Sequence, residues 1–265
     1  MNNYHTHTHY CDGANSPEEM VLKAIELGCD ELGFSGHSPI IFENDYAIRE
    51  EKLATYHDEI NRLKAKYRDK ITIYCGLELD YYGHDGGLKF DYIIGSVHHL
   101  VKNGKDFTID LSKAEQMRAV EELYNGDYYA FIDDYFTLLE QIYEKTNCTF
   151  IGHFDLIKKF NREGDLFDEQ NEYYIKRAKK AIETLVKKPC IFEVNTGAIP
   201  RGYRLDNYPA DIFIEEIGKT KPLFIVNADA HRAEKLLFDI EDTAKKLESA
   251  GYKTVKKLSE IIKEN

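Results

Sequence analysis

The chain of 265 residues is 43% hydrophobic and 31% charged, which is typical of a soluble protein with a buried core. Its 47 acidic residues outnumber 35 basic ones, and the net charge of −12 argues against nucleic acids or anionic membranes as partners. No apolar run approaches the roughly 18 to 20 residues of a membrane span, and no secretory signal pattern opens the sequence. We therefore expect a cytoplasmic protein, and the sequence indicates no oligomeric state.

The first predicted strand, residues 2–7, leads into the stretch HTHTHYCDG. Residues two apart in a strand face the same side, so His5, His7 and His9 are expected to line up. Neutral imidazole is the commonest protein ligand for zinc and related cations. Because these histidines alternate with threonine, a metal site is favoured over a purification tag or a solvated polar strand face.

Strands and helices alternate along most of the remaining chain. The helix after Ser16 has an N-cap, a first-turn proline and a capping-box glutamate, and an apolar stripe from Leu53 to Tyr67 predicts a second helix. Several predicted strands are nearly continuous in apolar residues, as in parallel sheets buried on both faces. We predict an α/β fold, a (β/α) barrel forming one domain over residues 1–265. Its six further strands lie at 31–37, 71–80, 90–99, 148–155, 190–195 and 222–231.

The connection between the fourth and fifth predicted strands, from about 102 to 147, is too long for a single helix. It contains the helical patterns AEQMRAVEELY and YYAFIDDYFTLLEQIYE. We interpret it as a helical insertion. It either covers the mouth of a site or only supports the fold, and the sequence favours neither role.

Residues that bind metals recur where the predicted strands end. In a parallel barrel these ends share one rim, where active sites are assembled. Independent core histidines would have no reason to recur at that position. With the N-terminal residues, the candidate ligands are His5, His7, Asp12, His37, Glu78, His98, His153, Asp229 and His231.

Nine candidates are too many for one tetrahedral ion, so we expect two or three divalent ions. Mixed imidazole and carboxylate ligands admit zinc, manganese or iron. Glu78 suits a bridge between two ions, with Asp80 as its rival. His9 is the alternative to Asp12. Only one of the adjacent His98 and His99 should face the centre.

The order of the motifs resembles the polymerase and histidinol phosphatase (PHP) family of metal-dependent phosphoesterases. The motifs are HTH with a following Asp-Gly, SGH, GLE, GSVH, GHFD and NADAH, and they run from His5 to His231. Length and spacing look closest to the stand-alone histidinol-phosphate phosphatases. Two positions depart from many relatives, which have Asp where this chain has Asn3 and T/S-D-H where it has Ser35-Gly36-His37.

The resemblance implies a distorted (β/α)7 barrel, similar to a TIM barrel, with a trinuclear metal centre at the C-terminal rim of the strands. It implies hydrolysis of L-histidinol phosphate in histidine biosynthesis; the alternative is a PHP-type phosphoesterase that acts on nucleotides or other small phosphate esters. The implied ligand groups are His5, His7, Glu78 and Asp229 for one ion, Glu78, His98 and His153 for a second, and Asp12, His37 and His231 for a third.

Our mechanistic hypothesis is that a hydroxide bridging two ions attacks phosphorus in line, without a phosphoenzyme. The catalytic candidates are Glu78, Asp229 and His231. Cys11 and Ser35 are alternative nucleophiles, although neither lies in a recognisable phosphatase loop. Arginine's planar fork matches phosphate oxygens. The expected substrate-binding residues are Ser35, Lys158, Arg201 and Arg204, with Lys159 beside Lys158.

Overall fold

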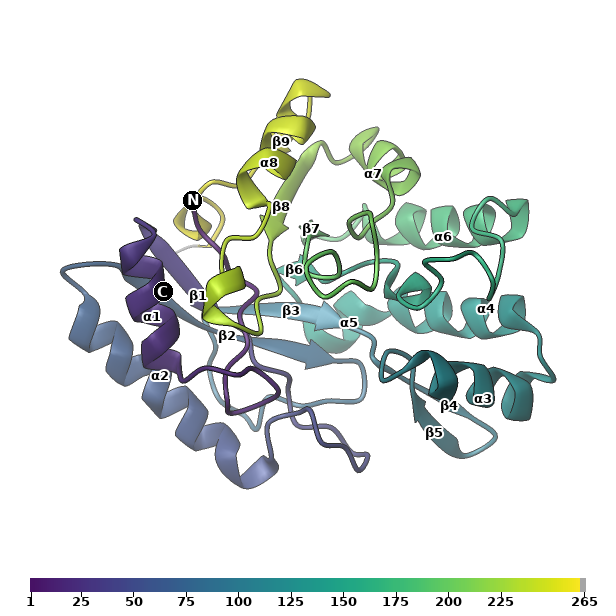
Figure 1. Ribbon diagram of the computed structural model, residues 1–265, viewed down its shortest axis with the longest axis horizontal. Coiled ribbons are helices and arrows are strands. Elements are labelled where there is room, and N and C mark those ends of the chain that lie inside the picture. Colours follow the sequence, from purple (N-terminus) through teal and green to yellow (C-terminus); the bar gives the residue numbers. More distant parts are fainter. Residues whose placement is uncertain (263–265) are drawn as a thin grey trace.

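A curled parallel sheet is the centre of the fold in the computed structural model, which describes residues 1–262. All neighbouring strands in it are parallel (Figure 1), as their long apolar runs predict. The architecture is the distorted, TIM-barrel-like fold expected from the sequence. In spatial order the strands are β1 (Glu31–Phe34), β2 (Thr72–Asp80), β3 (Tyr92–Ser96), β6 (Phe150–Ile151), β7 (Ile191–Asn195), β8 (Leu223–Asn227) and β9 (Lys253–Thr254).

The N-terminal segment, residues 2–7, lies between the two sides of the sheet but does not form the regular strand that was predicted. It makes isolated bridges, Asn3 to Leu32 in β1 and Thr6 to Ala230 beyond β8. The backbone hydrogen bonds of this segment alternate between these neighbours and side-chain partners, so a regular strand ladder does not form. β9, which pairs with β8, was not predicted because its two residues are too short to leave a pattern.

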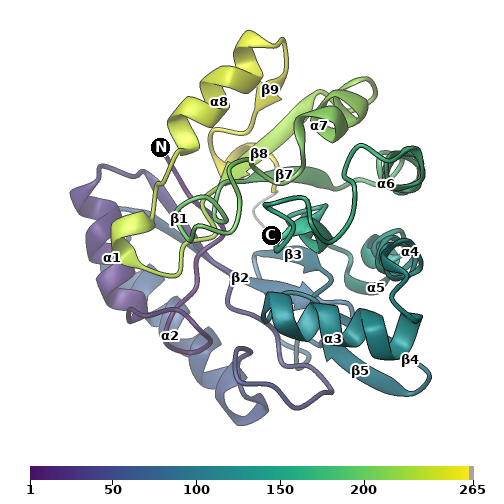
Figure 2. The ribbon, with the colours of Figure 1, turned by 45° about the vertical axis from the view of Figure 1, so that its right-hand side comes forward.

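Helices surround the outside of the sheet (Figure 2). Ser16 and Glu19 form the predicted capping box at the start of α1. The apolar stripe of the second predicted helix is buried in α2. These outer helices are α1 (Pro17–Glu26), α2 (Leu53–Tyr67), α6 (Glu172–Leu185), α7 (Asp211–Gly218) and α8 (Ile240–Ser249), with short 3-10 turns at Glu50–Lys52, Leu156–Lys158, Ala233–Lys235 and Leu258–Glu260. None of the described helices is long and apolar enough to cross a membrane.

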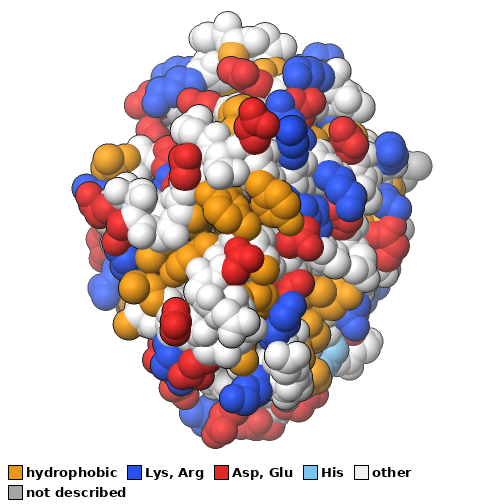
Figure 3. All heavy atoms as spheres, turned by 90° about the vertical axis from the view of Figure 1, so that its right-hand side faces the viewer, with side chains coloured by type: hydrophobic (Ala, Val, Ile, Leu, Met, Phe, Trp, Pro, Cys, Tyr) orange, Lys and Arg blue, Asp and Glu red, His pale blue; other side chains and the backbone are white. Residues whose placement is uncertain are grey.

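The long connection after β3 contains an unpredicted hairpin before its helices. β4 (His99–Lys102) and β5 (Lys105–Thr108) are antiparallel, so the predicted strand 90–99 ends early, at Ser96. The helical patterns form α3 (Lys113–Tyr124) and α4 (Tyr128–Leu139), followed by α5 (Ile142–Thr146). Figure 3 shows the face on this side of the molecule, where acidic and basic side chains are interspersed around an apolar area.

The two roles considered for the insertion belong to different parts of it. Arg177 of α6 pairs with Asp133 in the middle of α4 and with Glu140 directly after its last residue, with nitrogen–oxygen distances of 2.5 Å to each. Residues 108, 110 and 111 instead line a pocket at the rim of the sheet. The helices therefore support the fold, and the end of β5 with the residues that follow it borders the site.

Tyr92 connects the N-terminal segment to the sheet. Its hydroxyl lies 2.5 Å from the carbonyl oxygen of Tyr4 and 3.0 Å from that of Phe34. Its ring lies over Gly33 and Gly76, where a Cβ atom would be only 2.4 Å and 2.3 Å from atoms of the tyrosine. Tyr92 therefore adds a buried side-chain link to the backbone bridge between the segment and β1.

We expect Tyr92→Phe to lower the free energy of unfolding by about 1–2 kcal/mol, because it leaves a buried carbonyl without its donor. Tyr174→Phe is the matched control: its hydroxyl is also buried and finds no hydrogen-bond partner among residues 1–262. Urea denaturation of both variants measures the difference. Equal stability of the two variants would contradict the role given to Tyr92.

Candidate metal centre

The candidate ligands, far apart in the sequence, meet at the C-terminal ends of the strands. Each is contributed by the N-terminal segment, by β2, or by the first residues after another strand. Four groups of them have potential ligand atoms within 4.8 Å of one another. The groups are His7, Asp12, His37 and His231; His5, His7 and Asp229; His5, Glu78 and His153; and His37, Glu78 and His98.

Asp229 and the first two histidines form the deepest part of the cluster. His7 Nε2 lies 3.1 Å and His5 Nε2 lies 3.6 Å from Asp229 Oδ1. Glu78 Oε2 is 3.3 Å from the same His5 nitrogen. The four residues grouped by the family resemblance are therefore brought together.

Glu78 also faces a second pair of imidazoles. Its Oε1 lies 2.8 Å from His153 Nε2 and 3.4 Å from His98 Nε2. Asp80, the rival considered for Glu78, accepts a hydrogen bond from the backbone N–H of His98 at 2.8 Å. Asp80 therefore orients a neighbouring histidine, whereas the two oxygen atoms of Glu78 face two different sets of imidazoles. As expected of adjacent strand residues, His99 faces elsewhere and contacts Thr108.

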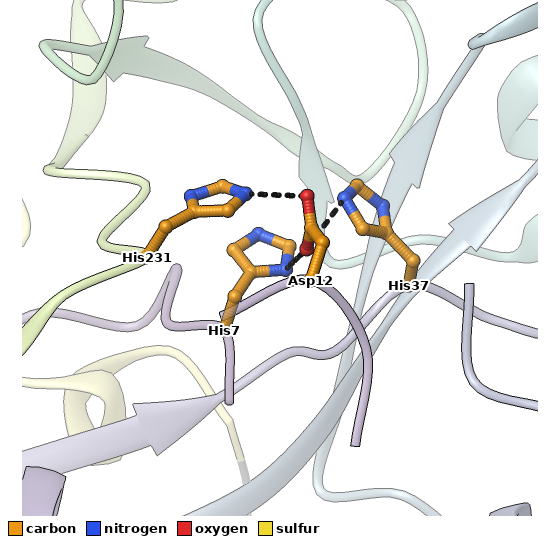
Figure 4. Close-up of side chains that lie close together, drawn as sticks. All are labelled: His7, Asp12, His37 and His231. Carbon is orange, nitrogen blue, oxygen red and sulfur yellow. Dashed lines mark hydrogen bonds and ion pairs between the residues drawn. The ribbon is translucent and has the colours of Figure 1, made fainter. Parts of the chain in front are cut away.

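Asp12 lies among three imidazoles (Figure 4). One carboxylate oxygen is 3.7 Å from both His7 and His37, and the other is 3.1 Å from His231 Nε2. His9 is exposed and stacks on a tyrosine instead. The prediction that three alternate histidines line up is wrong at His9, because the chain turns there, with the N–H of residue 11 bonded to the carbonyl of residue 8.

Unpaired polar atoms show that the cluster fits cations. In the part of the chain that the structure describes, five buried atoms at its centre make no well-aligned hydrogen bond, although they lie as close to one another as 2.8 Å. Leaving buried polar atoms unsatisfied is costly, so such a concentration indicates a missing ligand. Oxygen and imidazole nitrogen are suitable donors for zinc, manganese or iron. The atoms are His5 Nε2, His7 Nε2, His37 Nδ1, Glu78 Oε2 and Asp229 Oδ1.

Glu78 and His7 are in the protonation states that bind metal. Burial raises the pKa of the Glu78 carboxyl, but His37, His5 and other neighbours outweigh this and hold it well below its usual range. Burial and the nearby His231 and His37 lower the pKa of His7 to about 3, so its imidazole is neutral near pH 7. Ionised carboxylates and a neutral imidazole are the forms in which these groups bind metal.

Glu193 is one of the site residues that the sequence analysis missed. Its Oε1 lies 2.7 Å from His5 Nδ1, which leaves His5 Nε2 facing the centre of the cluster. Its other oxygen accepts a hydrogen bond from the backbone N–H of His153 at 2.9 Å. A carboxylate behind a ligating histidine fixes the ring and its tautomer. The available signal was a single acidic residue inside the apolar strand IFEVN.

Arg201 is the predicted phosphate-binding residue that the structure places at the cluster. Its Nη2 lies 3.0 Å from Asp229 Oδ2, and its Nη1 is 3.4 Å from His231 Nδ1. It lines a pocket of about 290 Å³ together with Asp12, His37, His231 and Lys159. The size is near the lower end for small-molecule sites.

Three other predicted substrate-binding residues do not reach this pocket. Ser35 is buried and its hydroxyl accepts the backbone N–H of residue 6. The Lys158 ammonium is buried between Asp155 and Asp206, at 3.0 Å and 2.7 Å. The Arg204 fork is occupied by a bidentate pair with the carboxylate of residue 169. These predictions are corrected: Lys159, not Lys158, accompanies Arg201 at the pocket.

The model of the PHP domain matches residues 3–197. The chain belongs to the PHP family. It is 28% identical to the "Probable histidinol-phosphatase" of Deinococcus radiodurans, over 95% of this chain and 94% of that protein. It is 25% identical to the histidinol-phosphatase of Lactococcus lactis, over 94% and 91%.

Solved structures share the fold. A structure from Listeria monocytogenes superposes with a TM-score of 0.79 at 21% identity and covers 91% of this chain and 99% of its own. The Lactococcus lactis histidinol phosphate phosphatase, complexed with zinc, L-histidinol and phosphate, superposes with a TM-score of 0.66 at 23% identity, over 96% and 95%. Both neighbours confirm the expected barrel.

We expect Glu193→Gln to weaken metal binding by about 10- to 100-fold, because a neutral amide no longer fixes the His5 imidazole as the carboxylate does. Isothermal titration calorimetry of the metal-free protein with zinc measures the change in affinity. Glu163→Gln, at an exposed position, is the charge-matched control. Unchanged zinc affinity in Glu193→Gln would show that Glu193 serves the fold alone.

Proposed function

We propose that this protein hydrolyses L-histidinol phosphate to L-histidinol and phosphate, a step of histidine biosynthesis. Membership of the PHP family and the names of relatives that match nearly the whole chain support the substrate. The main support for metal-dependent hydrolysis of a phosphate ester is that five unpaired, buried ligand atoms converge beneath a pocket that Arg201 also lines. The free thiols of all five cysteines are consistent with a reaction in the cytoplasm.

Two or three divalent cations would be held by the nine candidate ligands. Bound there, they would offset the negative charge of a phosphate ester and lower the pKa of a water molecule toward neutrality. We assign catalytic roles to Glu78, Asp229 and His231. Glu78 faces two imidazole groups, Asp229 lies between histidines and Arg201, and His231 opens onto the pocket.

The reaction needs no side-chain nucleophile. Attack of a water oxygen on phosphorus breaks the ester P–O bond, and the leaving alcohol oxygen takes up a proton. Burial, with a smaller effect of Asp12, raises the pKa of the Cys11 thiol to about 12, so it is protonated near pH 7. Ser35 has no access to the pocket. Trapping of a phosphorylated side chain would contradict this scheme.

A phosphate-release screen tests the proposed substrate. Protein loaded with zinc or manganese is given L-histidinol phosphate, nucleoside monophosphates and sugar phosphates at equal concentrations. We expect kcat/KM to be highest for L-histidinol phosphate. A clear preference for another ester would overturn the substrate while leaving the phosphatase reaction in place.

Arg201→Ala should lower kcat/KM by about 10- to 100-fold, because it removes a charge-assisted hydrogen-bond donor for a phosphate oxygen. Metal content should be unchanged, since Arg201 provides no metal ligand. Arg201→Lys keeps the charge but loses the planar fork, and is expected to recover only part of the activity. Wild-type kinetics in Arg201→Ala would exclude it from phosphate binding.

A further inference from the structure

One wall of the pocket comes from the end of β5 and the residues that follow it. This segment contributes Thr108, Asp110 and Leu111. Asp12, His37 and His231, which belong to the cluster, line the same pocket. An ester whose phosphate reaches the cluster therefore places its alcohol part in the space that this wall borders.

Asp110 is the acidic group of that wall. Lys159 donates to its backbone carbonyl at 2.9 Å and to its Oδ2 at 3.1 Å. Within residues 1–262 no hydrogen-bond donor reaches Asp110 Oδ1. This oxygen is not fully buried, so it remains accessible. The side chain of Asp110 is 20% exposed and that of Lys159 is 10% exposed. Lys159 thus holds the Asp110 carboxylate in place, and Asp110 faces the pocket.

The surroundings keep Asp110 ionised and fixed. Burial raises the pKa of its carboxyl, but Lys159 and the nearby His98 outweigh this and lower it to about 2. The Lys159 ammonium lies 4.8 Å from the centre of the Tyr203 ring, which holds it beside the pocket wall. A carboxylate held in place by its anchor needs little reorganisation to bind a second cation.

We propose that Asp110 is a specificity-determining residue that binds a cationic group in the alcohol part of the substrate. The inference rests on the proposed phosphatase function, because the phosphate end must lie at the cluster. A free carboxylate oxygen matches an ammonium or a protonated imidazole, and it repels a second anionic group. The site thus selects a phosphate monoester with a positive charge at its far end, such as the amine of L-histidinol phosphate.

The test compares 2-aminoethyl phosphate with n-propyl phosphate, which replaces the ammonium by a methyl group of similar size. For the zinc-loaded wild type we expect a higher kcat/KM with the cationic ester. In Asp110→Asn that preference should fall by about 10- to 100-fold, the range for a lost charge-assisted hydrogen bond. Asp106→Asn removes the same charge from the hairpin at a position outside this pocket and should keep the preference.

Calorimetry on the same zinc-loaded proteins separates the two ends of the ester. Asp110→Asn should weaken binding of L-histidinol by about 10-fold or more and leave binding of inorganic phosphate unchanged. An equal loss for both ligands, or for both esters, would show that Asp110 only positions Lys159 and would overturn the proposal. Unchanged binding of both ligands would overturn it as well.

Failure of the proposed function gives a different result. If nucleotides or sugar phosphates are hydrolysed better than L-histidinol phosphate, the assigned substrate is wrong. The dependence of the aminoethyl-to-propyl ratio on Asp110 would still support cation recognition in that case. Loss of that dependence, with L-histidinol phosphate still preferred, would overturn the role of Asp110 alone.

Discussion

The burial of ionised carboxylates among imidazoles at the rim of the sheet is the constraint on which the rest of the structure depends. Glu78 and Asp229 are buried, and each has one oxygen atom that accepts no well-aligned hydrogen bond from a described residue. Such groups are tolerated only when a compensating charge is present. The site is therefore built for cations, and its remaining features, including Arg201 and the pocket, are arranged around them.

Parallel topology explains why the site could be recognised from the sequence. Residues after β1, β3, β6 and β8 converge because parallel strands end at one rim, so the positions of His37, His98, His153 and Asp229 follow from strand prediction alone. The helix caps and apolar stripes were predicted for the same reason: they depend on local chemistry. The helix caps, the apolar stripes and the common rim of the parallel strands were therefore predicted correctly, whereas the local β4–β5 hairpin was not.

Most errors at the site occurred where a partner from elsewhere in the chain decides the outcome, and His9 is the exception. Lys158 and Arg204 follow strands as phosphate-binding residues would, but Asp206 and Glu169 neutralise them inside the fold. His9 continues the alternating pattern, and only a turn in the backbone removes it from the cluster. Glu193 was missed because its role depends on its contact with His5, which lies 188 residues earlier in the chain.

The placement of His5 and His7 on the N-terminal segment links two properties of the molecule. The same few residues that bridge β1 and the chain beyond β8 also supply ligand atoms to the deepest part of the cluster. A cation bound by these histidines would also stabilise the contacts of the segment with β1 and with the chain beyond β8, so ion binding and closure of the barrel wall would be coupled. Without the ion, local unfolding would then begin along this line.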